Sequence, residues 1–278
     1  MEKTALVTGA SSGFGLLSAE ELAAKGYHVL AAMRNPDKAK QAEQHFKQSG
    51  LSDQIKILML DVTDNDSIKN MEEELLKLRR LDVLVNNAGF AMGGFAEELD
   101  LSEYEEQFSV NVFGMMAVTN TVLPLMRENR SGKIINIGSI SGRAGFPGLS
   151  AYVASKFAVE GYSESLRLEL KPFSIDVVIV EPGSYRTNIW KSGRKMGSRT
   201  GTIADYHNQM QQMEAYLKEA EGGYGDPREV AELIAMVAEK RNPAFRYPVG
   251  KGIRAFLAAK ERLPWKIWEK LVLKHLFK

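Results

Sequence analysis

A glycine-rich turn close to the N-terminus constrains the fold of this chain more than any other feature. Residues 4–8 are a short apolar run, the turn Gly9-Ala-Ser-Ser-Gly13-Phe-Gly15 follows at once, and residues 16–25 have the pattern of a helix. This order is typical of a dinucleotide site, because glycine lets backbone N–H groups approach a pyrophosphate and the helix N-terminus adds partial positive charge. The spacing G-x-x-x-G-x-G differs from the common G-x-G-x-x-G, so the turn alone could equally be an ordinary loop.

Strand-like and helix-like segments alternate along the rest of the chain. Short apolar runs recur at residues 29–33, 55–60, 81–85, 133–138 and 175–180, and the intervening stretches 65–79, 101–126 and 151–170 have helical spacing. Near-continuous apolar strands separated by helices indicate a parallel sheet covered on both faces. Since no repeat or linker interrupts the pattern, we expect one α/β domain over residues 1–278.

The composition narrows the possible partners. A net charge of +1 gives no reason to expect nucleic acid, and the absence of cysteine excludes disulfides and thiolate metal sites. No metal site is predicted, because the four histidines are scattered without ligand spacing: His28, His45, His207 and His275. No apolar run approaches the roughly 20 residues of a membrane-spanning helix. The N-terminus enters a strand directly, so the expected location is the cytoplasm.

Tyr152 and Lys156 are the main candidates for chemistry. They lie four residues apart in a run with helical spacing, so their side chains share one face of a helix. A free phenol has a pKa of about 10, and a neighbouring ammonium group favours the phenolate and lowers that pKa. The pair then suits acid–base catalysis near neutral pH. The alternative is a ring that packs on an alkyl stem.

The end of the second strand bears on the choice of cofactor. NAD-binding sheets place an acidic residue there for the ribose 2′-hydroxyl, whereas this chain has Met33 followed by Arg34. An arginine pairs with a 2′-phosphate, so the sequence favours NADP over NAD. The alternative is an exposed arginine in a turn before Pro36. Asp61, after the third strand, could bind a cofactor or serve as an acid near a helix N-cap.

Taken together, these motifs resemble the short-chain dehydrogenase/reductase family in its short, single-domain branch. The matching residues run from the N-terminus to about Thr187: Thr8-Gly9-x-x-x-Gly13-x-Gly15, Asp61-Val62, Asn86-Asn87-Ala88-Gly89, Asn111, Ser139, Tyr152-x-x-x-Lys156 and Pro182-Gly183-x-x-x-Thr187. The resemblance implies a Rossmann-like, doubly wound parallel sheet of about seven strands, with residues 245–249 as the last strand. It also implies an oxidoreductase.

The resemblance assigns roles to four catalytic residues. Tyr152 is the general acid, or the base when an alcohol is oxidised. Lys156 lowers the pKa of that phenol and holds the nicotinamide ribose. Ser139 orients the substrate carbonyl, and Asn111 bends its helix and anchors a water next to Lys156.

The resemblance further implies an NADP site. Asp61 would bind the adenine amino group, the loop 86–89 would touch the ribose, and Thr187 would contact the nicotinamide carboxamide. The full expected set is Gly9, Ser11, Ser12, Gly13, Phe14, Gly15, Arg34, Asp61, Val62, Asn87, Ala88, Gly89, Tyr152, Lys156, Pro182, Gly183 and Thr187.

The substrate side of the site is expected to be apolar. Phe146 and Leu149 lie between Ser139 and Tyr152 in the sequence and are predicted to line the pocket with them. The insertion 184–225 carries an apolar stripe over residues 203–220, which could be a mobile lid or could simply pack on the body. A hydrophobic alcohol, ketone or aldehyde is therefore expected, and the sequence around Tyr152 is similar to hydroxysteroid and retinol dehydrogenases.

The C-terminal residues 252–278 read as a helical extension. Tryptophans and aliphatic residues alternate there with lysines, so the last helix could lie on a membrane surface, cap the pocket or pack on a partner; burial is the favoured interpretation. The family resemblance implies a homodimer or homotetramer through the helices at 101–126 and 151–170. Two other classes stay open, a non-catalytic NADP-sensing module and an isomerase or epimerase on the same scaffold.

Overall fold

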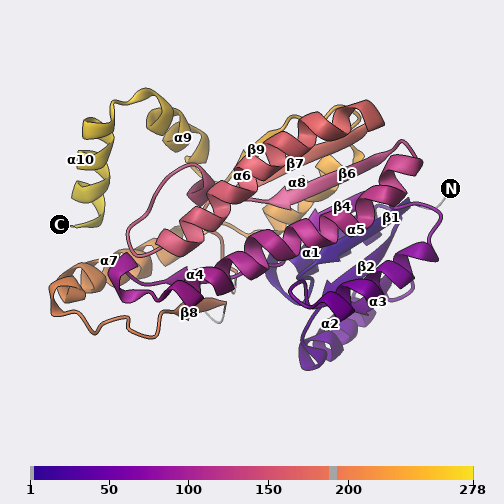
Figure 1. Ribbon diagram of the computed structural model, residues 1–278, viewed down its shortest axis with the longest axis horizontal. Helices are drawn as coiled ribbons and strands as arrows, with labels where there is room; N and C mark the ends of the chain where they lie inside the picture. Colours follow the sequence, from indigo (N-terminus) through magenta and orange to yellow (C-terminus); the bar gives the residue numbers. More distant parts are fainter. Residues whose placement is uncertain (1–2, 188–192, 278) are drawn as a thin grey trace.

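The computed structural model describes residues 3–187 and 193–277. Seven parallel strands form the central sheet in the order β3-β2-β1-β4-β6-β7-β9, which confirms the predicted fold (Figure 1). The strands are β1 (Lys3–Thr8), β2 (Tyr27–Met33), β3 (Ile55–Met59), β4 (Val83–Asn86), β6 (Gly132–Ile137), β7 (Ile175–Pro182) and β9 (Arg246–Val249). The order reverses next to β1, so the β1 and β4 ends border the crevice where such sheets bind ligands.

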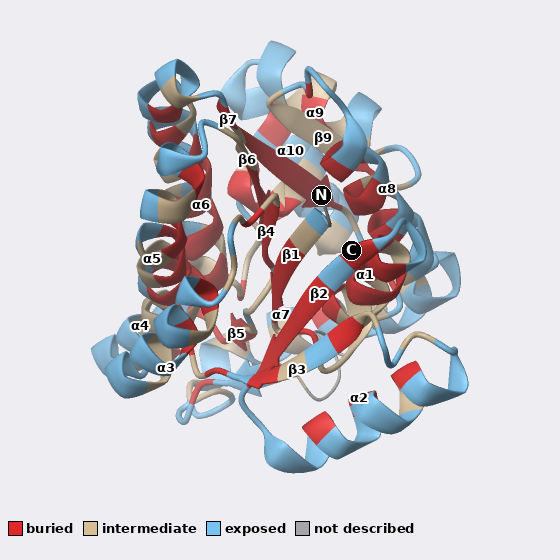
Figure 2. Cartoon of the chain, turned by 90° about the vertical axis from the view of Figure 1, so that its right-hand side faces the viewer, coloured by how far each residue is buried: buried red, intermediate tan, exposed pale blue. Residues whose placement is uncertain are grey.

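Helices cover both faces of the sheet, as the apolar strands require (Figure 2). One apolar core packs α1 (Gly13–Ala24), α2 (Pro36–Gln48) and α8 (Pro227–Glu239) on the sheet. The other packs α3 (Asn65–Leu76), α5 (Met115–Glu128) and α6 (Ser150–Leu170) on the opposite face. Two separate cores with one sheet between them make the doubly wound arrangement.

One long helix crosses the second face and contains a widened turn. It comprises α4 (Leu101–Phe108), a π-helical turn at Ser109–Gly114, and α5. By length and composition this 28-residue stretch could cross a membrane, which the sequence analysis did not anticipate. Its residues Val118, Val122 and Met126 are fully buried against the sheet. The apolar character of α5 therefore matches a core helix, whereas Leu101 and Phe113 of the preceding segment are exposed.

The remaining strands and helices lie outside the seven-stranded sheet. A small parallel pair joins β5 (Ala91–Gly93) to β8 (Arg194–Met196). Helix α7 (His207–Ala220) lies in the insertion for which the sequence left a lid or packing on the body open. The extension forms α9 (Ile253–Arg262) and α10 (Trp265–Leu276), which Figure 1 shows as an arm at one end of the molecule.

Candidate active site

The glycine turn and the loop after β4 are fitted to one another. Gly9 has φ +64°, and a Cβ there would lie 2.8 Å from the Cα of Ala88. A Cβ on Gly15 would lie 2.4 Å from Nδ2 of Asn87. That Nδ2 donates hydrogen bonds to the carbonyl oxygens of Thr8 and Gly9, both at 3.0 Å. A side chain at Gly9 or Gly15 would thus collide with the facing loop, and with glycine at both positions the backbone stays accessible to a ligand.

A groove of about 310 Å³ runs along these loops. It is lined by most of the predicted cofactor residues: Gly9, Ser11, Ser12, Gly13, Phe14, Arg34, Asp61, Val62, Asn87, Ala88, Gly89 and Thr187. Lys38, which the sequence analysis did not select, also lines it. A glycine-walled groove at a helix N-terminus, with two cations at one end, fits a phosphorylated dinucleotide.

Arg34 and Asp61 face each other at that end. Their charged groups approach to 3.9 Å, and the Arg34 side chain is 67% exposed. Partial burial opposes ionisation of Asp61, but hydrogen bonds from the backbone and hydroxyl of Thr63, together with the Arg34 charge, hold its pKa below the ordinary value. Asp61 is therefore a carboxylate next to Arg34, and both line the groove.

The four predicted catalytic residues meet in a second cavity of about 60 Å³. Asn111 comes from the π-helical turn, Ser139 follows β6, and Tyr152 and Lys156 lie on α6. Pro182 and Gly183 line it too. The cavity shares Phe14, Asn87, Gly89, Phe90 and Thr187 with the cofactor groove. The two spaces therefore adjoin, as hydride transfer between a dinucleotide and a substrate requires.

The electrostatics of the pair differ from the sequence prediction. Burial raises the pKa of Tyr152 to about 12, while a hydrogen bond with Ser139 acts in the opposite direction. Burial also lowers the pKa of Lys156 to about 8, and Glu160 opposes that shift. The Lys156 ammonium donates to the carbonyl oxygen of Ile137 at 2.7 Å. The pKa of the phenol thus lies above its ordinary value, not below it as the sequence suggested, because desolvation is the largest effect on Tyr152 in this structure.

Asn111 is held rigidly in the widened turn of its helix. Its Oδ1 accepts from the backbone N–H of Phe90 at 3.1 Å, and its Nδ2 donates to the Phe90 carbonyl and to Oγ of Ser155, at 3.1 and 3.2 Å. The side chain thus joins the helix to the loop after β4, and the predicted irregularity of this helix is confirmed. Its proposed water stays a prediction.

Of the four predicted substrate residues, Ser139 and Tyr152 line the catalytic cavity. Phe146 and Leu149 are absent from the lining of the cavity that holds Ser139 and Tyr152. Phe146 stacks on Phe256 of α9, with ring centroids 6.2 Å apart. In α7 the buried Met213 lies against Gly148, where a Cβ would meet its methyl carbon at 2.7 Å. The insertion therefore packs on the loop that precedes α6.

A family comparison agrees with this geometry. The sequence model for short chain dehydrogenases matches residues 3–197. The chain belongs to the short-chain dehydrogenase/reductase family. It is accordingly an oxidoreductase built for hydride transfer, and its sheet and single-domain form are those of the family.

Relatives of this short-chain dehydrogenase span its whole length. An uncharacterized oxidoreductase of Bacillus subtilis is 45% identical and covers 99% of both chains. A 3-ketodihydrosphingosine reductase of Bacteroides thetaiotaomicron is 38% identical over 93% of this chain and 92% of its own. An NADPH-dependent 3-dehydrocapnine reductase of Ornithobacterium rhinotracheale is 34% identical over 99% and 97%.

Solved structures show the same fold. A short-chain dehydrogenase from Streptomyces avermitilis superimposes with a TM-score of 0.81 at 35% identity, covering 98% of this chain and 97% of that one. ElxO with NADP bound has a TM-score of 0.76 at 26% identity, covering 92% and 100%.

A buried chain of hydrogen bonds connects Asn86 of the family motif to Thr119, Asn136 and Ser163, which the sequence analysis did not select. Asn86 Nδ2 donates to Oδ1 of Asn136 and to Oγ1 of Thr119, both at 2.9 Å, and Asn136 Nδ2 donates to Oγ of Ser163 at 2.8 Å. These bonds join β4 and β6 to α5 and α6. An asparagine inside the apolar run Ile134-Ile135-Asn136-Ile137 was the available signal, since a polar residue there must find partners.

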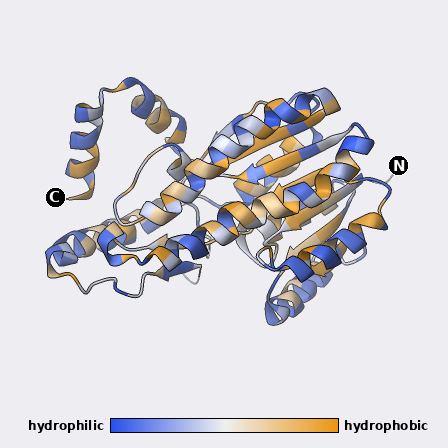
Figure 3. Cartoon of the chain, viewed as in Figure 1, coloured by the Kyte–Doolittle hydropathy of each residue, from blue (hydrophilic) through white to orange (hydrophobic). Residues whose placement is uncertain are grey.

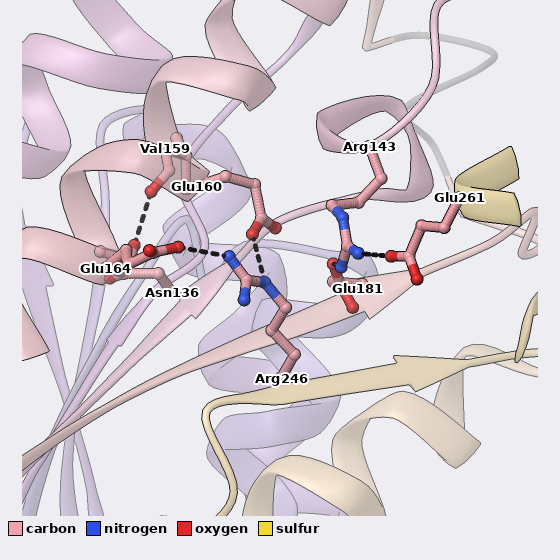
Figure 4. A network of polar contacts seen from close by, with 9 residues as sticks. Asn136, Arg143, Val159, Glu160, Glu164, Glu181, Arg246 and Glu261 are labelled. Atoms are coloured by element: carbon pink, nitrogen blue, oxygen red, sulfur yellow. Dashed lines mark hydrogen bonds and ion pairs between the residues drawn. The ribbon is translucent and has the colours of Figure 1, made fainter. Parts of the chain in front are cut away.

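A charged cluster behind α6 was also missed (Figure 4). Glu160 pairs with Arg246 of β9 at 2.9 Å, and Arg143 pairs with Glu181 of β7 at 3.0 Å and with Glu261 of α9. Burial raises the pKa of Glu160 although Arg246 opposes the shift. These pairs tie α6, the helix of Tyr152, to β9, and they tie the loop after Ser139 to β7 and to the extension.

Proposed function

We propose that the protein reduces a hydrophobic ketone with NADPH, and oxidises the corresponding alcohol in reverse. The observation that carries this proposal is the hydrogen-bonded pair of Ser139 and Tyr152 in a cavity that adjoins the dinucleotide groove. A ketone oxygen that gains negative charge needs a proton donor and a second hydrogen-bond donor, and this pair offers both.

Tyr152, Ser139 and Lys156 have separate roles in the proposed reduction. NADPH supplies the hydride when bound. Tyr152 is a neutral phenol at pH 7, because its pKa is about 12, so it is ready to donate a proton to the substrate oxygen. Ser139 orients that oxygen, and Lys156, still mostly protonated at pH 7 with a pKa of about 8, stabilises the phenolate that forms.

The choice of NADPH rests on Arg34 and Lys38. Both line the groove where the adenosine ribose is expected, and no acidic residue stands at the end of β2, where Met33 is buried. Two similar proteins support the same cofactor, since the Ornithobacterium relative is named an NADPH-dependent reductase and the ElxO structure holds NADP.

The direction and the substrate class rest on the relatives. The Bacteroides and Ornithobacterium enzymes are both named reductases, and the name of the first specifies a 3-keto substrate. Phe90, Ile137 and Tyr185 give the catalytic cavity apolar walls. We therefore place the reactive carbonyl on an aliphatic chain.

The test is the loss of NADPH absorbance with a series of linear ketones of increasing chain length. We expect turnover to rise with chain length, and Tyr152→Phe to lower it by a factor of about 10²–10⁴. Tyr27→Phe, a buried tyrosine at the opposite end of the sheet, is the matched control. Full turnover in Tyr152→Phe would refute the assignment.

A further inference from the structure

Helix α10 exposes apolar side chains that a helix of a globular domain normally buries. Trp265, Ile267, Leu271 and Leu273 are 63%, 49%, 51% and 46% exposed, and Trp268 is the buried member of the helix. Figure 3 shows strongly hydrophobic residues alternating with hydrophilic ones along this arm. The favoured sequence interpretation, burial of the apolar side chains, therefore holds only for the part of the helix around Trp268.

The charge of the extension differs sharply from that of the body. Residues 251–278 contain eight lysines and arginines and two acidic residues, which gives a net charge of +6. The whole chain carries +1, so the first 250 residues carry −5. Of the two acids, Glu261 is paired with Arg143. A segment so basic on an acidic body indicates an anionic partner for this end of the molecule.

The basic and apolar residues of α10 are arranged in neighbouring rows. Lys266, Lys270 and Lys274 follow one another at intervals of four, and Ile267 and Leu271 form the adjacent row. All five are exposed. Lysine stems can lie along an apolar surface while their ammonium groups reach outward. This is the arrangement of helices that lie in the interfacial plane of a bilayer.

The opposite side of α10 is anchored to the protein. Trp268 packs edge-on against Phe256 of α9 at 5.0 Å, and Phe256 stacks on Phe146 of the loop before α6. His275 packs against Tyr216 of α7 at 5.2 Å. The rows of Lys270 and Leu271 are thus held facing outward on a fixed helix.

We propose that α10 docks the protein on the surface of an anionic lipid bilayer. The lysines pair with the headgroups, and Ile267 and Leu271 enter the boundary between headgroups and acyl chains. The docked protein meets an aliphatic ketone where such a molecule partitions, in the lipid, and that consequence rests on the proposed function.

The test is co-sedimentation of the full-length protein with phosphatidylcholine vesicles, with and without phosphatidylglycerol. We expect binding only to the anionic vesicles, and weaker binding at high salt. Charge reversal by K266E/K270E/K274E should lower partitioning by more than about a hundredfold, because each lysine near an anionic surface contributes roughly a fivefold factor and the three glutamates are repelled. The control K40E/K47E/K69E changes three exposed lysines of α2 and α3 equally and should bind like the wild type.

A second variant separates the membrane from a protein partner. I267S/L271S should bind anionic vesicles at least tenfold more weakly and keep the oligomeric state of the wild type in sedimentation velocity. Failure of the wild type to bind anionic vesicles would overturn the proposal, and so would a change in oligomeric state caused by I267S/L271S. Vesicle binding requires no turnover, so its outcome is independent of the reductase assay.

Discussion

The Lys156 ammonium lies 5.8 Å from the centre of the Tyr152 ring and donates to the carbonyl oxygen of Ile137. The hydrogen bond holds the charge at the end of β6, next to Ser139. The phenol keeps its proton because it is buried, so the resting site is prepared to donate a proton rather than to accept one.

The pKa of Lys156 predicts a pH limit for ketone reduction. A lysine with a pKa of about 8 is charged below that pH and loses its charge above it. We expect the rate of reduction to be flat between about pH 6 and 7 and to fall above about pH 8, because a neutral amine no longer stabilises the phenolate. Lys156→Arg, which stays charged, should move the fall to higher pH. An unchanged pH profile in that variant would exclude Lys156 as its source.

Lys133 predicts a stability effect away from the active site. Its buried ammonium donates to the carbonyl oxygens of Val237, Ala238 and Lys240 at 2.7–2.8 Å, at the end of α8. Lys133→Met leaves these carbonyls without their donor, so we expect a loss of about 1–3 kcal/mol in the free energy of unfolding. Urea denaturation measures this loss. The exposed Lys69→Met is the control and should change stability by less than about 0.5 kcal/mol.

Local sequence patterns were sufficient for most strands of the sheet, whereas the predicted catalytic set and the last strand came from the family resemblance. The apolar runs fix the strands because each must be covered on both faces, and Tyr152 and Lys156 share a helix face by spacing alone. The pKa of Tyr152 was not accessible in this way, since it depends on burial that distant elements create.

The sequence analysis also missed residues whose role depends on how separate elements pack together. Lys38 reaches the cofactor groove only because α2 begins beside Arg34, where Asn35 caps the helix through the N–H groups of Asp37 and Lys38. The exposure of Leu271 likewise depends on which side of α10 packs on α9. Periodicity locates a helix face, but it does not show what covers that face.

Exposed apolar residues on α4, the π-helical turn and α6 support the predicted homodimer. Leu101, Phe113, Phe157 and Leu168 are 74%, 60%, 48% and 74% exposed. Burying them against a second copy would remove apolar surface from water. We expect a dimer or tetramer at micromolar concentration and a shift toward monomer for Phe113→Ser/Phe157→Ser, measured by sedimentation velocity. A wild-type monomer would contradict this prediction.

The cytoplasmic location also stays a prediction.

Cofactor preference provides the last prediction, and it depends on Arg34 and Lys38. A guanidinium at the 2′-phosphate makes a charge-assisted, forked contact. Such a contact contributes about 1.5–3 kcal/mol. Lys38 supplies the second cation, which the glycine turn itself lacks at Ser11 and Ser12.

We expect Arg34→Ala to weaken NADPH binding by about tenfold to a hundredfold, as that energy implies, and to leave NADH binding nearly unchanged, because NADH has no 2′-phosphate. Lys38→Ala should have a smaller effect in the same direction, and Lys40→Ala, on the same helix but outside the groove lining, should have none. Met33→Asp/Arg34→Ala should reverse the preference, since a carboxylate then repels the phosphate and can bind the ribose hydroxyls. Fluorescence titration with both reduced cofactors measures each step. If the wild type binds NADH as tightly as NADPH, then Arg34 remains paired with Asp61 and does not bind the 2′-phosphate.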